Sequence, residues 1–491
     1  MAGRPPTSDA ATLEPELEVA LVVPEPGSRR TRRELYEQLR AAIRAGRLAP
    51  GLRMPASRHL AERLGVSRNT IIAVYELLLS EGCLVARPGS GTFVAEGGPG
   101  KARRPAASDM AGRIQPFWRD RPPIVLPPTA RRTFHVGVPD LAAFPWELWR
   151  TIANRTLRGY SRAPALGMSP QGAPALRQAI AGHLSFARGV ACQADDIVVT
   201  SAAQQAFDLL ARVLVHRPGM VVAVEDPGYA PVRQAFAAAG ATIVGAPVDD
   251  EGIVVEALAP GAEVVCVTPS HQFPLGVPMS PRRRQALLDF ARRTGALVIE
   301  DDYDGEFRFD GRPLEALQTL DVSQQVIYIG TFSKSLFPDL RLGFIVAPEW
   351  ARGPLTAAKM ASDGRSSVIS QLTLAAFIAE GHLARHVRRM RRIYAERRQV
   401  LFEATSGAPK GWFEPFPSAA GLHLALRLPP EVDAVEVLKV AAGLGVGAYP
   451  LSQFAVQPSA QNGLVLGYGA LPKDDVRIAA LALVEAARQV G

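Results

Sequence analysis

Lys334 follows a short apolar run and lies among side chains that could bind an anion. The run Val326–Ile329 predicts a buried strand, and Thr331, Ser333 and Arg341 accompany the lysine in the segment after it. A lysine amine forms a Schiff base with an aldehyde, and hydroxyl groups together with a guanidinium can hold a phosphate group. This stretch therefore predicts a covalent anchor for a phosphorylated aldehyde. The alternative is a surface lysine in a polar loop.

Residues able to hold such a ligand follow two predicted strands upstream. Ala203 and Gln204 open a predicted helix after the run Ile197–Thr200, and small residues at a helix start leave backbone N–H groups open to an anion. Tyr229 follows the run Met220–Val224 and offers a ring that can stack on an aromatic cofactor. Each feature alone also fits an ordinary helix cap or a polar loop.

Asp301 and Tyr303 follow a third apolar run, Leu297–Glu300. A carboxylate can keep a pyridine nitrogen protonated, and a phenol can hydrogen-bond to a ring hydroxylate. Because ligands of open α/β sheets bind at the carboxyl ends of the strands, we expect these residues to share one site with Lys334.

The composition is that of a globular protein without membrane or export signals. The 491 residues are 47% hydrophobic and 21% charged, and no apolar run approaches the roughly 18 residues that cross a bilayer. Glu14, Glu16 and Glu18 argue against a secretory signal. The three cysteines form no metal-ligand pattern and fit a reducing compartment. We expect a cytoplasmic protein of at least two domains, with no membrane partner.

The positive charge is concentrated near the N-terminus. Residues 28–104 contain 15 Lys or Arg and six Glu, whereas the whole chain has a net charge of +8. The rest of the chain is therefore close to neutral. A basic module joined to a near-neutral body predicts a polyanionic partner at one end of the chain only.

Two short helices joined by a turn are predicted within this basic stretch. Ser57 is placed to cap a helix over residues 58–64, and Ser67 is placed to cap a second helix over residues 68–80. Apolar residues at helical spacing give the second helix a buried face. Two short strands flank the turn at Gly89 and predict a hairpin, so the module is a helix-turn-helix with a wing.

Arg68, Asn69 and Thr70 occupy the first turn of the second helix, which reaches base edges and phosphates in this motif. The alternative is a small helical cap whose arginines are only solvated. We predict contact with double-stranded DNA through these three residues together with Arg53, Ser57, Arg58, Ser67, Arg87 and Gly89.

Composition also predicts the domain boundaries. Residues 1–27 are expected to be a loose arm, residues 28–96 the DNA-binding domain, and residues 97–130 a linker rich in Pro and Gly. Alternating strands and helices over residues 131–491 predict an α/β domain around a mostly parallel sheet. Its last part, residues 417–491 or so, predicts a smaller α+β subdomain.

The basic stretch resembles a GntR-type winged helix-turn-helix. The resemblance covers residues 32–94 or so, and is carried by the run that begins at Leu35, by Leu64-Gly-Val-Ser-Arg-Asn-Thr and by Gly89-Ser-Gly-Thr-Phe-Val. The resemblance implies binding of operator DNA by a dimer.

The order of motifs that leads to Lys334 resembles fold-type I, aspartate-aminotransferase-like enzymes that use pyridoxal 5′-phosphate (PLP). Joined to a GntR-type module, the chain is similar to the MocR/GabR group of bacterial transcriptional regulators. The resemblance implies that Lys334 forms a Schiff base with PLP, Asp301 pairs with the pyridine nitrogen and Tyr303 contacts the ring hydroxyl. It further implies a head-to-tail homodimer, a stacking ring from Tyr229, and a phosphate site made of Ala203, Gln204, Thr331, Ser333 and Arg341.

Three positions depart from the pattern of relatives that handle amino acids. Val465 stands where an arginine would grip a substrate carboxylate, Phe273 stands in place of the usual asparagine, and Gly167-Met168-Ser169 lacks a tyrosine that reaches the partner's phosphate. Loss of a buried bidentate clamp should weaken amino-acid binding by a few kcal/mol. We therefore expect PLP itself to be the main effector. Micromolar binding of a common amino acid to the PLP-loaded protein would contradict this expectation.

Three functions compete on this evidence. The leading hypothesis is a DNA-binding transcriptional regulator that senses PLP, or an amine or amino acid through PLP. The second is a PLP-dependent aminotransferase with an appended DNA-binding module, and residual transaminase activity is also compatible with the first. The third treats the PLP pocket as a relic within a dimerisation platform.

Overall fold

The structure, a computed structural model, divides into two compact units, Met1–Gln115 and Pro116–Gly491. The predicted arm up to residue 18 and much of the predicted linker lie outside the described residues, so the domain boundaries stay predictions. The described residues are 19–23, 30–96, 110–120, 129–162, 169–309, 315–418, 420–457 and 461–491.

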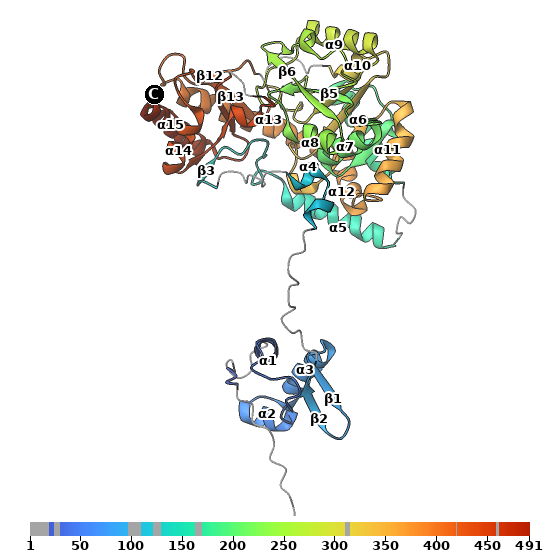
Figure 1. The fold of residues 1–491 in the computed structure, drawn as a ribbon, viewed down its shortest axis with the longest axis vertical. Coiled ribbons are helices and arrows are strands. Elements are labelled where there is room, and N and C mark those ends of the chain that lie inside the picture. The colour runs from blue at the N-terminus through green and yellow to red at the C-terminus, as the bar shows by residue number, and fades with distance from the viewer. Residues whose placement is uncertain are drawn as a thin grey trace, which may run out of the picture. The chain divides into compact units, whose positions relative to one another are not determined.

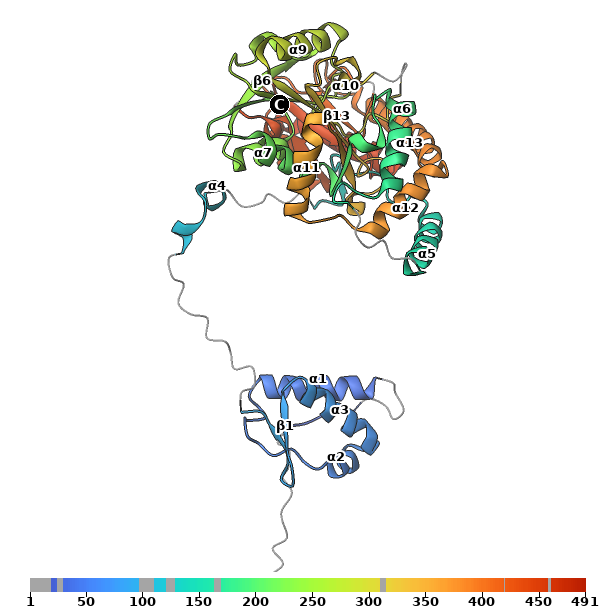
Figure 2. The same ribbon diagram turned by 90° about the vertical axis from the view of Figure 1, so that its right-hand side faces the viewer.

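The first unit contains three helices followed by a two-stranded antiparallel hairpin (Figures 1 and 2). The hairpin pairs Leu84 with Val94 and Arg87 with Gly91. Both the two adjacent helices and the wing are therefore where the sequence predicts them. The elements are α1 (Thr31–Arg44), α2 (Ser57–Leu64), α3 (Arg68–Ser80), β1 (Leu84–Arg87) and β2 (Gly91–Val94).

Apolar residues at helical spacing build the core of this unit. Leu35 and Leu39 on α1 pack with Ile71 and Val74 on α3, and all four side chains are buried. Val19, which the sequence assigns to a loose arm, is buried in the same core. Val19 therefore contributes to the core of the first unit.

The two serines predicted to cap helices behave differently. Ser67 caps α3, because its Oγ accepts a hydrogen bond from the Thr70 backbone N–H at 3.1 Å. The prediction for Ser57 is wrong: α2 begins at Ser57 itself, and Ala56 before it makes no side-chain cap. The extended backbone of Ala56, with ψ of 141°, places the helix start one residue earlier than predicted.

An eight-stranded sheet forms the centre of the second unit. Five neighbouring strands, from β10 across to β6, are parallel, while β11, β4 and β7 run antiparallel to the strands beside them. This confirms a mostly parallel sheet. In spatial order the strands are β4 (Ile197–Thr200), β11 (Gly343–Val346), β10 (Val326–Thr331), β9 (Leu297–Asp302), β8 (Val264–Val267), β5 (Val221–Asp226), β6 (Thr242–Asp249) and β7 (Gly252–Ile253).

Helices cover both faces of this sheet. On β8, Val264 and Cys266 pack in the cluster that includes α7 (Ala202–Leu214) and α8 (Ala230–Ala238). Val265 and Val267 pack in the cluster that includes α9 (Pro281–Thr294). Because successive side chains of a strand point to opposite faces, a strand covered on both faces is a continuous apolar run. This explains why the strands were recognisable as short apolar segments.

Three strands of the central sheet run further than the sequence predicts, and the first of them is β5, which ends at Asp226 rather than at Val224. β9 continues through Asp302, so Asp301 is a strand residue that pairs with Ile329 rather than the first residue after the strand. β10 likewise continues to Thr331. The sequence placed the polar residues after the strands because only the apolar residues marked each strand. In the structure, the backbone hydrogen bonds between parallel strands continue past the last apolar residue.

The remaining helices surround the sheet and continue into a C-terminal subdomain (Figure 1). No helix among the described residues is long and apolar enough to span a membrane. The helices are α4 (Pro116–Arg119), α5 (Trp146–Arg162), α6 (Pro174–Arg188), α7 (Ala202–Leu214), α8 (Ala230–Ala238), α9 (Pro281–Thr294), α10 (Leu317–Leu320), α11 (Glu349–Ser362), α12 (Val368–Ala379), α13 (His382–Thr405), α14 (Ala434–Gly443) and α15 (Lys473–Val490).

The C-terminal subdomain is an antiparallel sheet with helices α14 and α15, as predicted for an α+β fold. One element comes from far upstream, because β3 (Arg132–Thr133) pairs with β14 (Val446–Gly447). The segment after β3 therefore begins beside the subdomain. The four sheet strands are β12 (Glu414–Pro415), β13 (His423–Arg427), β16 (Gly463–Gly467) and β15 (Tyr449–Pro450).

Candidate functional site

A cavity of about 420 Å³ opens at the carboxyl ends of the parallel strands. It brings together all nine residues that the sequence predicts for a cofactor site, although they are spread over more than 130 positions of the chain. These residues are Ala203, Gln204, Tyr229, Asp301, Tyr303, Thr331, Ser333, Lys334 and Arg341.

Lys334 presents its amine to this cavity just after β10. Burial lowers the pKa of the Lys334 amine, while the carboxylates of Asp304 and Asp301 oppose that shift. A lower pKa raises the fraction of neutral amine, which is the form that attacks a carbonyl carbon. The local environment therefore favours a nucleophilic lysine.

Gly137 lies directly against this amine. Its φ is +71°, and a Cβ placed on it would be 2.6 Å from the Lys334 Nζ. Gly137 was not predicted as a site residue from the sequence, and it comes from the segment between β3 and α5. A glycine is needed here both for the left-handed backbone and for space beside the lysine.

We predict that Gly137→Ala weakens PLP binding at least about tenfold, because the added methyl group occupies the space of the amine and strains the backbone. Spectrophotometric PLP titration of purified protein measures this. Gly159→Ala is the matched control, since nothing lies within 4 Å of a Cβ at that helical position. Equal PLP affinity in Gly137→Ala and the parent protein would contradict the placement of Lys334.

Asp301 brings a buried carboxyl group to the cavity. Its Oδ1 is buried and has no hydrogen-bond partner among the described residues. Burial and, to a smaller extent, the neighbouring Asp302 carboxylate together raise the pKa of Asp301 to about 8, although the Lys334 charge opposes the shift. A buried acceptor without a donor is costly, so this oxygen is suited to a ligand that carries an N–H group.

Aromatic rings form the walls beside Asp301. Tyr229 lies edge-to-face with Phe273, with ring centroids 5.3 Å apart, and Tyr303 lies edge-to-face with the same ring at 5.9 Å. Phe273, which replaces the expected asparagine, therefore lines the cavity with apolar surface. These walls can enclose a flat aromatic ligand.

Part of the cavity lining can bind an anion. α7 starts at Ala202, and the preceding Ser201 makes no side-chain cap, so the first N–H groups of the helix remain available to a ligand. Thr331 and Ser333 add hydroxyl groups, and Arg341 adds a guanidinium. A phosphate group would find backbone donors, hydroxyls and a positive charge in one place.

Two of the four described non-glycine residues with positive φ line this cavity. Ala202 and Arg341 have φ of 64° and 49°, which are unusual for residues other than glycine. The Arg341 Nη2 donates to the Ser201 carbonyl at 3.2 Å and so ties the two strained segments together. Strained conformations of this kind persist where surrounding structure enforces them, and they gather at ligand sites.

Further lining residues were not predicted as site residues from the sequence. They come from the segment before α5, the start of α7, the segment between β8 and α9, the 3₁₀ turn that follows Lys334 and the C-terminal subdomain. The glycine in Val136-Gly137 was the only local signal. These residues are Val136, Gly137, Ala202, Phe273, Pro338, Tyr449 and Phe454.

Val465 lies outside the cavity lining. The side chain is fully buried in an apolar cluster with Leu275, Val277 and Phe416. Among the described residues that line the cavity, Lys334 and Arg341 are the only cations. The strand position at which an arginine was expected thus supplies no second positive charge to this cavity.

The predicted DNA-binding residues lie on the surface of the first unit. Arg68, Asn69 and Thr70 form the first turn of α3; the first two are exposed and Thr70 is half-buried. Among the described residues, Arg68 has no hydrogen-bond or ion-pair partner. Its guanidinium is available to a phosphate or a guanine edge.

The other arginines of this surface are exposed and partly paired. Arg87, at the end of β1, contacts Glu96 at 2.9 Å and lies 4.8 Å from the centre of the Phe93 ring. Arg58 is 3.7 Å from Glu62. Exposed pairs of this kind are weak, so both arginines can exchange their partner for a phosphate.

Gly89 lies at the tip of the wing with a φ of +73°, which suits the tight turn. At the base of the wing, the Arg53 side chain lies against Gly91, where a Cβ would be 3.2 Å from its Nε. The nine predicted DNA-binding residues thus belong to α2, α3, the wing or the segments next to them.

Known proteins resemble each of the two units, and some relatives resemble both together. Residues 31–94 match the family of bacterial regulatory proteins of the gntR type, and residues 146–482 match the class I and II aminotransferases. The probable rhizopine catabolism regulatory protein MocR of Rhizobium meliloti is 40% identical over 456 residues, which cover 91% of each chain. The chain belongs to the MocR/GabR-type regulators of the GntR family.

This MocR-type regulator is also 33% identical over 462 residues to the HTH-type pyridoxine biosynthesis transcriptional regulator PdxR of Corynebacterium glutamicum, over 94% of this chain and 96% of that one. Its body is similar to kynurenine aminotransferase of Pyrococcus horikoshii, with a TM-score of 0.69 and 28% identity over 79% of this chain and 96% of that one. These findings confirm the predicted fold class.

Proposed function

We propose that this transcriptional regulator binds operator DNA through its winged helix and holds PLP on Lys334, and that PLP occupancy changes its affinity for DNA. The observation that carries the proposal is the cavity of the second unit. Its lining offers a lysine amine whose pKa is lowered by burial, together with backbone donors and a guanidinium. PLP carries the two matching groups, an aldehyde and a phosphate.

The residues that line the cavity match each functional group of PLP. Asp301 has a buried oxygen without a donor, which suits the pyridine N–H, and Tyr303 offers a hydroxyl beside it. Tyr229 provides an aromatic wall, while Arg341 and the first turn of α7 face the phosphate. When bound, PLP supplies an aldehyde that reacts with the amine of a lysine or of a ligand.

PLP itself is proposed as the main effector. An amino acid bound beside PLP needs a cation for its carboxylate, and the buried Val465 supplies none. Lys334 and Arg341, the two cations of the described lining, are assigned to the aldehyde and the phosphate of PLP. A small amine without a carboxylate remains compatible with the remaining space.

DNA recognition is proposed for a homodimer. The exposed first turn of α3 carries Arg68 and Asn69, side chains that pair with guanine and adenine edges respectively. Two copies of the unit would read two half-sites, as dimeric helix-turn-helix proteins do. PLP can change the affinity of the dimer for DNA only if it binds the dimer arrangement that is competent for DNA binding more tightly, or less tightly, than the arrangement that is not.

We predict that PLP changes the Kd of the full-length protein for its operator at least about fivefold, the lower range of coupling between two sites. The operator is first selected from genomic fragments by the purified protein, and fluorescence anisotropy then measures the Kd with and without PLP. The Lys334→Ala variant is the control and should not respond. An unchanged Kd at full PLP loading would contradict the proposed regulation.

A second candidate is a PLP-dependent aminotransferase with an appended DNA-binding module. The similarity of the body to the kynurenine aminotransferase structure favours it. Steady-state transamination with a panel of amino donors separates the two functions. Robust turnover would support the enzyme, whereas its absence in PLP-loaded protein would support the regulator.

A further inference from the structure

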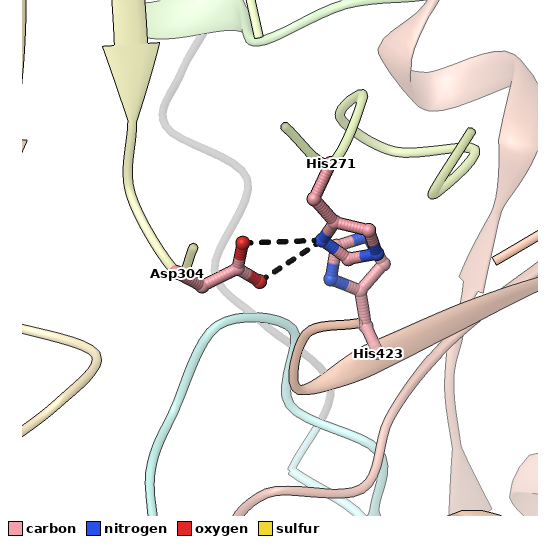
Figure 3. Close-up of side chains that lie close together, drawn as sticks. All are labelled: His271, Asp304 and His423. Carbon is pink, nitrogen blue, oxygen red and sulfur yellow. Dashed lines mark hydrogen bonds and ion pairs between the residues drawn. The ribbon is translucent and has the colours of Figure 1, made fainter. Parts of the chain in front are cut away.

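His271 joins the cavity to the C-terminal subdomain through a buried polar network. Its Nδ1 lies 3.0 and 3.2 Å from the two carboxylate oxygens of Asp304, and His423 from β13 lies beside the imidazole ring (Figure 3). All three side chains are buried. None of the three was predicted as a site residue from the sequence.

The hydrogen bonds fix the orientation of the His271 ring. Because Nδ1 faces a carboxylate, it carries the proton and donates to Asp304. The opposite nitrogen, Nε2, lies 3.3 Å from the Ser418 Oγ, whose hydroxyl hydrogen also points to the Ala420 carbonyl oxygen at 3.3 Å. Asp304 therefore holds the imidazole in one tautomer, as carboxylate partners of histidines commonly do.

Tyr303 connects this histidine to the cavity. Its hydroxyl lies 2.9 Å from both the carbonyl oxygen and the Nδ1 of His271, while the residue also lines the cavity. In this arrangement the hydroxyl donates to the carbonyl oxygen. The Tyr303 oxygen then accepts a share of the single Nδ1–H that His271 also donates to Asp304.

Two imidazoles and a carboxylate also have the composition of a metal site, since ligand atoms of all three lie within 4.8 Å of one another. The Gly421 backbone packs directly against this cluster and leaves no room there for a side chain. A Cβ on Gly421 would be 2.5 Å from the His271 Nδ1 and 2.7 Å from an Asp304 oxygen, and the Tyr303 hydroxyl approaches the same nitrogen. A hydrogen-bond network therefore accounts for this cluster.

We propose that His271, oriented by Asp304, is a positioning residue that holds the Tyr303 hydroxyl as a hydrogen-bond donor to the ring hydroxyl group of bound PLP. The inference rests on the proposed function. When a ring oxygen offers a better acceptor, Tyr303 can turn its O–H from the His271 carbonyl to that oxygen. The Nδ1–H of His271 then retains the Tyr303 oxygen in place.

Several charged groups face Tyr303 and bear on any pH dependence. Burial raises the pKa of the Tyr303 phenol well above its usual range, and the Asp304, Asp301, Glu225 and Asp302 carboxylates add to this effect. The phenol therefore stays protonated and able to donate. The titratable groups near it are these four carboxyls with His271, His423 and Lys334.

The test compares how the absorbance of bound PLP depends on pH. The absorbance reports protonation of the Lys334 nitrogen that is joined to PLP. If Tyr303 donates a weaker hydrogen bond, more negative charge stays on the ring oxygen of PLP. That charge stabilises the proton shared between the ring oxygen and the Lys334 nitrogen, so the pH at which the proton is lost rises. We predict that His271→Phe and Asp304→Asn raise the pH midpoint by about one unit or more and still load PLP.

His183→Phe is the matched control, because His183 is a half-buried histidine beside the Glu306 carboxylate and lies outside the cavity lining. It should titrate like the parent protein. Parent-like midpoints in both folded test variants would overturn the inference, as would loss of PLP loading in them. Failure of the parent protein itself to load PLP would instead overturn the proposed function.

Discussion

Replacing Lys334 by alanine is expected to abolish covalent PLP binding and to weaken total PLP affinity at least about 100-fold. The covalent bond disappears with the amine, while the helix N-terminus and Arg341 still attract the phosphate group weakly. The measurement is the absorbance of PLP titrated into the purified variant, followed by borohydride reduction and intact mass.

Two further variants distinguish loss of the amine from loss of its positive charge and from general effects of mutation. Lys334→Arg keeps a positive charge in the cavity but cannot form a Schiff base, so it should also fail to be labelled. Lys410→Ala removes an exposed lysine and should be labelled like the parent protein. PLP labelling of Lys334→Ala equal to that of the parent protein would place the anchor elsewhere.

Replacing Arg68 by alanine is expected to eliminate specific operator binding while PLP loading stays unchanged. A base or phosphate contact by arginine is worth roughly 1–3 kcal/mol per subunit, and a dimer loses it twice. Anisotropy with operator and with unrelated DNA measures the specific part of the affinity. Arg68 is exposed on α3, so the fold should tolerate the change.

Arg44→Ala provides the control for charge, because Arg44 is an exposed arginine at the end of α1 in the same unit. It removes the same charge without changing the first turn of α3. Its operator affinity should therefore fall by much less. An Arg68→Ala variant that binds its operator as tightly as the parent would refute the proposed recognition helix.

Local patterns were sufficient to predict much of the fold. Apolar residues at helical spacing identified the buried face of α3, and continuous apolar runs such as Ile197–Thr200 identified strands covered on both faces. The nine predicted cofactor residues lie together because parallel strands end at one edge of a sheet. Each prediction depended on neighbours in the chain or on a rule of sheet topology.

Long-range packing was not predictable in this way. Gly137 lies beside Lys334 only because the segment after β3 passes the cavity, and Tyr449 reaches the same cavity from the subdomain. The His271 network likewise joins distant segments. The start of α2 at Ser57 was missed for a local reason, since a serine can stand inside a first turn as well as before it.

The central claim is that one amine of this regulator carries PLP. The most direct measurement is borohydride reduction of the PLP-treated full-length protein, followed by proteolysis and mass spectrometry of the peptides. The account predicts a reduced phosphopyridoxyl group on the peptide that contains Lys334, at close to one group per chain. A protein that stays colourless with PLP and shows no such group on Lys334 would contradict it.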